Sequence, residues 1–259
     1  MGKEASRDGT VGKALDVLDQ IAAFERPIRF SEILDCSPHP KATLYRLIQT
    51  LTNQGMLTYS EESGTYILGI RLVRLAHSAW RQSSLAPIAR PFLDALAKDV
   101  GETLHLAQMD DGQVLYMDKR NAAEPVEMFS SAGKIGPGHS TGVGKAILAY
   151  MSPQNQSRAL RRQSFYQYTS NTLTSEGALK IELTKIAKTG IAFDREEHEI
   201  GIICIAVPIL NTRKHAIGAI SLTSTTARNS LKSLQNYSKI LQKTANQITQ
   251  AAEDWQFPT

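Results

Sequence analysis

The 259-residue sequence lacks the marks of an exported or membrane-spanning protein. It contains only two cysteines, Cys36 and Cys204, which are too few for a disulfide framework and which we interpret as reduced thiols. No apolar run approaches the roughly 18 to 20 residues that a membrane span requires. The first ten residues, MGKEASRDGT, have no apolar stretch of the kind found in secretory signals. These absences predict a cytoplasmic protein that does not associate with membranes.

Acidic residues are scarce between Cys36 and Leu93. Glu61 and Glu62 are the only acids there, and the basic residues in the same stretch are Lys41, Arg46, Arg71, Arg74, Arg81 and Arg90. The whole chain is mildly basic, with a net charge of +4. A stretch with so few acids can approach a polyphosphate without repelling it, but the same charges also suit an ordinary solvated face.

The first eighty residues have the pattern of three short helices followed by a hairpin. Apolar residues recur at helical spacing from Val11 to Ala22, FSEILD fits a second helix, and KATLYRLIQTLTNQG fits a third. In MLTYSEESGTYIL, apolar and aromatic residues alternate on both sides of the turn at residues 61–64, which is typical of a β-hairpin. This order predicts a winged helix-turn-helix domain over residues 8–69.

The third predicted helix has an apolar side and a polar side. Its apolar stripe consists of Leu44, Leu47, Ile48 and Leu51. In a winged helix-turn-helix this helix enters the DNA groove, and small residues at its start let the backbone approach the base edges. The candidate DNA-binding residues are Pro40 (as first helical residue), Lys41, Ala42, Thr43, Tyr45, Arg46 and Gln49. A three-helix module that binds another protein would show a similar polar face and remains the alternative.

Residues 70–84 read as a linker helix. Leu72, Val73, Ala76, Ala79 and Trp80 form its apolar stripe. Such a stripe can dock on a partner surface or on the helix's own domain, and periodicity alone does not decide between them.

Residues 85–259 have the pattern of an α+β domain with an antiparallel sheet. A helix is expected over 87–99, a strand–turn–strand over 103–120, a strand in PVEMFSSAGKIGPGHS, and a helix in TSEGALKIELTKIAKTG. Two further strands, GIICIAVPILN and AIGAISLTS, are joined by a polar turn, and a last helix runs from about Leu231 to Ala252. Strands in hairpins with helices at the ends favour this fold class.

Several motifs in order resemble the IclR family of bacterial transcription regulators. HPKATLYRLIQTLTNQGML resembles its recognition helix, and GTYILGIRLVRLAHSA resembles the wing and the entry to its linker helix. GHSTGVGKAILAYMS, GIAFDREEHEIGIICIAVPILN and AIGAISLTSTTAR resemble motifs of its effector-binding domain, which is related to GAF and PAS sensor folds. One departure is Pro38, which stands where the family usually has a glycine in the turn before the recognition helix.

The resemblance implies a regulator, with repression as the expected mode, that binds double-stranded DNA at a palindromic operator. It also implies a homodimer paired through the linker, or a dimer of dimers (a homotetramer), and a small carboxylate-type metabolite as effector. Carried over by motif, the effector site comprises Thr141, Gly142, Val143, Gly144, Asp194, Ile202, Cys204, Ser221 and Thr223. In this interpretation, backbone N–H groups at a helix start hold the carboxylate, and the side chains of Asp194, Ser221 and Thr223 fix hydroxyls.

Two stretches of the sequence also resemble sites with other chemistries. GHSTGVGK nearly matches a phosphate-binding loop, which would make residues 139–146 part of a nucleotide-binding switch. However, His139 stands at the first glycine position and Ala146 replaces the hydroxyl that would bind Mg²⁺. The stretch from Asp194 to Cys204 could instead belong to an enzyme, or to a metal site with His139 and His198, although its spacing matches no standard ligand pattern. We therefore expect no catalytic residue, no cofactor and no metal.

Overall fold

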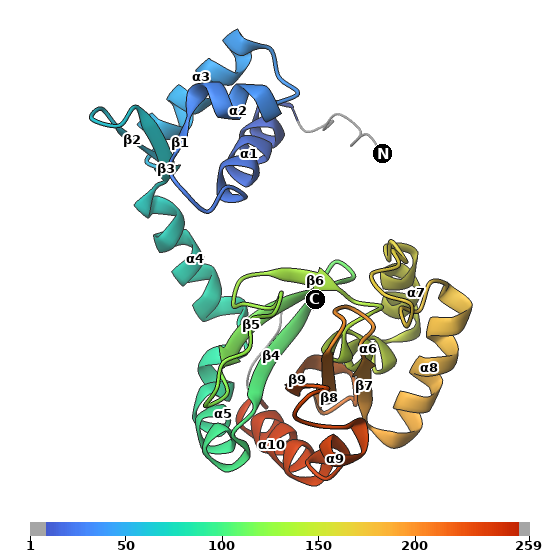
Figure 1. Cartoon of the computed structure of the whole chain (residues 1–259). Coiled ribbons are helices and arrows are strands. Elements are labelled where there is room, and N and C mark those ends of the chain that lie inside the picture. Colours follow the sequence, from blue (N-terminus) through green and yellow to red (C-terminus); the bar gives the residue numbers. More distant parts are fainter. Residues whose placement is uncertain (1–8, 254–259) are drawn as a thin grey trace. The chain divides into compact units, whose positions relative to one another are not determined.

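The computed structural model describes residues 9–253, and the chain divides into two compact units between Gln82 and Ser83 (Figure 1). Residue 8, the expected start of the first domain, and residues 254–259 of the second lie outside the described residues. None of the helices within 9–253 is both long enough and apolar enough to cross a membrane.

The first unit is a winged helix-turn-helix, as the sequence predicts. Its three-stranded antiparallel sheet has the order β1-β3-β2. Its elements are α1 (Gly9–Ala22), β1 (Ile28–Arg29), α2 (Phe30–Cys36), α3 (Lys41–Asn53), β2 (Leu57–Ser60), β3 (Thr65–Leu68) and α4 (Ile70–Ser83). The two-residue strand β1, which pairs Ile28 with Tyr66, was not expected from the sequence because it is too short to show alternation.

Helix α3 is held by its apolar stripe. Leu44, Leu47, Ile48 and Leu51 are all buried in the core of the first unit. Full burial of each such side chain contributes about 1.5–3 kcal/mol. Pro40 is the N-cap rather than the first helical residue, so the helix begins one residue later than expected.

Helix α4 follows the wing strand β3 and has several apolar side chains exposed to solvent. Leu72 packs against the core of the first unit, and the Arg71 guanidinium donates hydrogen bonds to the Gln54 carbonyl at 2.8 Å and to its side-chain oxygen at 2.9 Å. In contrast, Ile70 and Val73 are 73% and 60% exposed. Of the predicted stripe, Leu72 packs on its own unit, whereas Val73, Ala76 and Ala79 are exposed and Trp80 is half-buried.

The second unit contains a six-stranded antiparallel sheet with the order β6-β5-β4-β9-β8-β7 (Figure 1). Its strands are β4 (Thr103–Asp110), β5 (Gln113–Arg120), β6 (Ile135–Pro137), β7 (Ala192–Arg195), β8 (Ile202–Leu210) and β9 (Ala216–Thr225). Its helices are α5 (Ala86–Val100), α6 (Gly142–Ala149), α7 (Pro153–Arg161), α8 (Glu176–Thr189), α9 (Leu231–Gln235) and α10 (Ser238–Ala251). The α+β class with an antiparallel sheet is confirmed.

The two faces of this sheet carry different side chains. Helix α6 lies on the face of Cys204 and Ala206, which a Cβ on Gly142 would meet. Helices α5 and α10 pack against each other and against β4, β8 and β9. Because side chains alternate along a strand, Ile203, Ile205 and Val207 point to the opposite face from Cys204. The face towards α6 is rich in small residues, which lets the helix approach closely.

The structure departs from the sequence-based expectations at several places in this unit. The segment PVEMF forms no strand: residues 121–134, which we call the β5–β6 connection, are irregular, and only Ile135–Pro137 pair with β5. The expected last helix is split at Asn236 and Tyr237 into α9 and α10, because the amides of both residues bond back over three residues rather than four. Helix α7 was not expected, although Ser152 and Pro153 form an ordinary helix start.

Candidate functional sites

The predicted DNA-binding residues share the open side of α3. Pro40, Lys41, Ala42, Tyr45, Arg46 and Gln49 are exposed, and Thr43 is half-buried. The Tyr45 ring meets Phe30 edge-on, with 6.0 Å between centroids, yet remains 53% exposed. Anchoring the ring at one edge limits its freedom while its hydroxyl stays available. The helix thus presents one cationic and polar face that can reach phosphates and base edges together.

The predicted effector residues come together on the α6 face of the large sheet. Asp194 pairs with Cys204, and Cys204 pairs with Thr223, so these side chains form a row across β7, β8 and β9. Ser221 lies two residues from Thr223, on the same face. All four are buried, whereas Ile202, at the start of β8, is half-buried.

The start of α6 packs against this row of side chains. Thr141 is its N-cap, and its hydroxyl accepts a hydrogen bond from the Gly144 amide at 3.3 Å. The amides of Gly142 and Asp194 donate to the Cys204 sulfur. Two of the first amides of α6 therefore already have partners within the chain, so a ligand would share this helix start with Thr141 and Cys204.

Burial governs the ionisation of the groups in this row. It raises the pKa of the Cys204 thiol to about 12, which leaves the sulfur protonated at neutral pH and unsuited to act as a nucleophile. It also raises the pKa of Asp194 to about 7, against the opposing effect of Lys145 and of the Glu197 amide, which donates to Asp194 Oδ1 at 2.8 Å. Asp194 can therefore present either a carboxylate or a protonated acid to a ligand near neutral pH.

Lys145, the lysine of the near-phosphate loop, is fully buried and forms an ion pair with Glu197. A phosphate-binding lysine must reach into an open cradle, but this ammonium group points at a carboxylate inside the protein. The geometry therefore gives no support to a nucleotide switch at residues 139–146. The pair instead joins α6 to the connection between β7 and β8.

Sequence reasoning missed His105, on β4. It is 2% exposed and pairs with Ser221 across the β4–β9 ladder. Its Nδ1 lies 3.4 Å from Ser221 Oγ and 3.3 Å from Thr223 Oγ1, and its Nε2 lies 2.7 Å from Ser130 Oγ. The only signal in the sequence is a histidine in the strand TLHLAQMD, which reads equally well as a core residue.

No metal site is apparent between residues 9 and 253, where no three His, Cys, Asp or Glu side chains are grouped to hold an ion. His139 and His198, the candidate ligands, both contact the ring of Tyr168, with centroid distances of 6.1 and 4.7 Å. Phe129 meets His198 at 4.9 Å. These histidines are therefore part of an aromatic cluster beside the start of α6.

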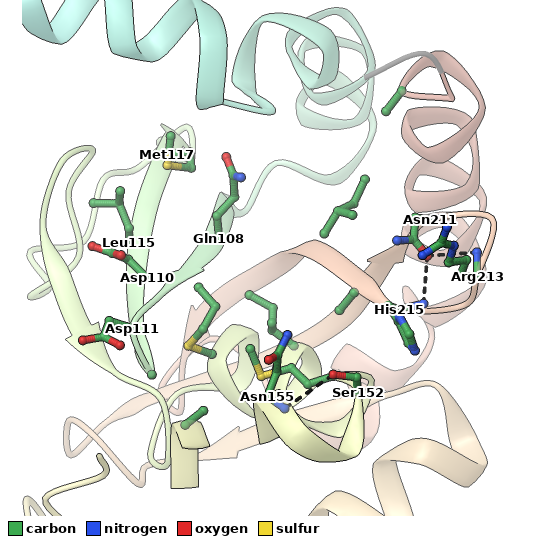
Figure 2. A pocket seen from close by; sticks show the side chains of 18 of the residues that line it. Gln108, Asp110, Asp111, Leu115, Met117, Ser152, Asn155, Asn211, Arg213 and His215 are labelled. Atoms are coloured by element: carbon green, nitrogen blue, oxygen red, sulfur yellow. Dashed lines mark hydrogen bonds between the residues drawn. The ribbon is translucent and has the colours of Figure 1, made fainter. Parts of the chain in front are cut away.

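A large cleft of about 1250 Å³ opens elsewhere in the second unit (Figure 2). Three of the chain's six methionines, Met109, Met117 and Met151, line it. Figure 2 shows Asp110 and Asp111 across the cleft from Asn211, Arg213 and His215. None of the predicted effector residues lines this cleft. Gln108 does, and its side-chain oxygen accepts a hydrogen bond at 2.9 Å from the amide of Leu85, the residue that precedes α5.

Both units match domains of known protein families. Residues 10–61 match the IclR helix-turn-helix domain, and residues 77–250 match the bacterial transcriptional regulator IclR C-terminal domain. The regulator XynR of Escherichia coli is 29% identical over 242 residues, covering 93% of this chain and 96% of XynR. The crystal structure of Thermotoga maritima IclR has 29% identity and a TM-score of 0.75, covering 93% of this chain and 97% of that one.

A third match is an IclR homologue from Microbacterium hydrocarbonoxydans crystallised with 4-hydroxybenzoate. It is 23% identical, with a TM-score of 0.80, covers 94% of this chain and 98% of that one, and shows the same fold. The E. coli relatives XynR and IclR are transcription regulators by name rather than enzymes, which argues against the enzyme interpretation of the Asp194–Cys204 stretch. This chain belongs to the IclR family of bacterial transcriptional regulators.

Proposed function

We propose that this regulator acts in the cytoplasm as a repressor whose affinity for a palindromic operator is set by a small carboxylate-type metabolite bound in the second unit. The observation that carries the DNA half of the proposal is the face of α3, where Lys41, Tyr45, Arg46 and Gln49 are exposed together. The observation that carries the effector half is the buried polar row around Cys204 and Thr223.

The α3 face suits DNA because it combines cations with hydrogen-bonding groups. Lys41 and Arg46 can neutralise phosphates, and Gln49 can read a base edge. Loss of Arg46 should weaken operator binding by roughly 1–3 kcal/mol if it contacts a base, which is about 5- to 150-fold. If Arg46 contacts only phosphate, binding should weaken about equally on all sequences and the salt dependence should become shallower.

The test starts with selection of binding sites from a random DNA library, followed by gel shifts over a salt series. The full chain should select a two-fold symmetric sequence. Arg46→Ala should bind that sequence at least fivefold more weakly, and Arg213→Ala, which removes an exposed arginine of the second unit, should bind it like the wild type. Absence of any enriched sequence would contradict the proposal.

A dimer is supported by the exposed apolar residues of the first unit. Ile70 and Val73 on α4, and Val11 and Leu15 on α1, are each more than half exposed. Two copies that cover these residues would also match the symmetry of a palindrome. Val73→Glu should lower the molecular mass measured by light scattering and abolish cooperative operator binding. An unchanged mass would place the dimer contact elsewhere.

A carboxylate-type effector is supported by the chemistry around the α6 helix start. Amides at a helix N-terminus favour an anion, and Ser140, which is 0% exposed, has a hydroxyl without a partner among residues 9–253. The homologue crystallised with 4-hydroxybenzoate is a protein of this fold in complex with a small hydroxylated carboxylate. A thermal-shift screen of sugar acids, keto acids and aromatic carboxylates tests this; no stabilisation by any of them would count against the effector class.

The proposed mechanism is a shift between two populations. An effector changes operator affinity only if it binds one arrangement of the paired DNA-binding units more tightly than the other. A coupling of 1–3 kcal/mol would change operator affinity by about 5- to 150-fold.

A further inference from the structure

The polar row that we propose as the effector site continues beyond the residues identified by motif. His105 joins Ser221 and Thr223 on the sheet side and Ser130 on the β5–β6 connection. All four side chains are buried. The ring of Tyr116 lies 5.4 Å from that of His105 and covers it from β5. Converging polar groups of this kind, beside small residues and a helix start, are the groups that fix the orientation of a ligand in a binding site.

The chemistry of His105 defines what it can bind. Burial holds its pKa down to about 3, with a further lowering effect from Lys119, so the imidazole is neutral at physiological pH. A neutral imidazole has one N–H donor and one bare nitrogen acceptor, which suits a hydroxyl or carbonyl group rather than a second ion. The hydroxyls of Ser221 and Thr223 can rotate to complement whichever nitrogen carries the proton.

Ser130 ties the covering connection to this cluster. Its hydroxyl meets His105 Nε2 at 2.7 Å, and its carbonyl accepts a hydrogen bond from Lys119 Nζ at 2.8 Å. The neighbouring Phe129 amide donates to the carboxylate of Glu199 at 3.1 Å, and the Phe129 ring meets His198. The connection is thus fixed both to the sheet and to the residues that follow β7.

We propose that His105 and Ser130 are specificity-determining residues of the effector site, and that an uncharged hydroxyl or carbonyl group of the effector binds His105 Nε2 in place of the Ser130 hydroxyl. This inference rests on the proposed function, because it concerns the same site. The effector's carboxylate lies towards the start of α6, and its uncharged polar group lies at His105. When the ligand displaces the Ser130 hydroxyl from His105, the β5–β6 connection loses this hydrogen bond to the sheet.

The first arm of the test needs no effector. Hydrogen exchange of the full-length protein, read by mass spectrometry, should show amides of residues 124–134 exchanging up to about tenfold faster in Ser130→Ala, as expected for loss of one hydrogen bond. Ser131→Ala, a change at the exposed neighbouring serine, should exchange like the wild type. Unchanged exchange in Ser130→Ala would overturn the role of the Ser130–His105 contact.

The second arm compares carboxylates that differ by one hydroxyl, namely lactate with propionate and 4-hydroxybenzoate with benzoate, by calorimetric titration. The wild type should bind the hydroxylated member at least tenfold more tightly in the pair that it accepts. His105→Leu should lose that preference, and His105→Gln, which keeps a donor and an acceptor, should retain part of it. A preference that survives in His105→Leu would overturn the inference while leaving the effector function intact. Absence of binding by the wild type to all four would overturn the proposed ligand chemistry, and the exchange arm would still decide the Ser130 contact.

Discussion

Replacement of Gly142 by alanine tests how closely α6 packs on the proposed effector site. A Cβ at this position would lie less than 3.0 Å from Cys204 Sγ, a separation that real Cβ atoms do not show, and 3.4 Å from the Ala206 Cβ. Both neighbours are buried on β8, a strand paired on both sides, so neither can withdraw into solvent. Helix α6 or the strand must therefore move.

The expected cost follows from overpacking of a buried site. Such insertions typically destabilise a protein by about 1–3 kcal/mol. The better helix propensity of alanine returns up to about 1 kcal/mol. We expect Gly142→Ala to lower the free energy of unfolding of the second unit by about 1–2 kcal/mol. Gly177→Ala on α8, where a Cβ meets nothing within 4 Å, should be neutral or stabilising.

A double-mutant cycle isolates the contact. Cys204→Ala alone should cost about 1 kcal/mol through the lost sulfur contacts, but in Gly142→Ala/Cys204→Ala the new methyl group occupies the space that the sulfur leaves. The double variant should therefore be more stable than the sum of the single changes predicts, by about 1–2 kcal/mol. Urea unfolding followed by circular dichroism measures all four proteins. Additive effects would refute the close packing of α6 on β8.

Three further changes have outcomes that the structure defines. The pKa of Asp194 is about 7 in the folded protein, against 3.8 for an ordinary aspartate, so the folded protein binds this proton more tightly than the unfolded chain does. The free energy of unfolding should therefore fall by up to about 4 kcal/mol as the pH rises through this range. Urea midpoints measured from pH 4 to 8 should show this fall in the wild type and lack it in Asp194→Asn. Lys145→Met removes the buried cation beside the Glu197 carboxylate and leaves, among the described residues, only the partly exposed Arg195 at 3.7 Å. It should cost about 3–5 kcal/mol in the same assay at pH 7.5, with a smaller loss in Lys145→Met/Glu197→Gln; equal losses would contradict the pairing. Gln108→Leu deprives the buried Leu85 amide of its acceptor and should cost about 1–3 kcal/mol, with faster hydrogen exchange at the start of α5; unaltered exchange there would contradict the anchoring role.

The elements that the sequence predicted well are those whose patterns are set locally. The spacing of Leu44, Leu47, Ile48 and Leu51 fits only a helix with that side buried, and the structure contains this helix as α3. The alternation of apolar and polar residues on either side of residues 61–64 likewise fits a hairpin, which the structure contains as β2 and β3. The β5–β6 connection shows the opposite case, because its contacts at Ser130 and Phe129 reach residues far away in the chain.

The candidate site shows the same division. The family resemblance implied that Asp194, Cys204 and Thr223 belong to one site, and strand pairing brings these residues side by side. Spacing in the sequence could not indicate His105, because its neighbours in the ladder come from a strand more than a hundred residues later. Nor could it show that Lys145 faces Glu197, since a lysine after a glycine-rich stretch reads as a phosphate ligand until its partner is seen.

The most direct test of the account is the affinity of the full-length protein for its selected operator, with and without the carboxylate that gives the largest thermal shift. Fluorescence anisotropy on labelled operator should show at least a fivefold change in Kd on addition of this carboxylate to the wild type. Thr223→Val should bind the operator normally but lose most of the response. The account would be contradicted if the carboxylate changed operator affinity equally in both proteins, or in neither.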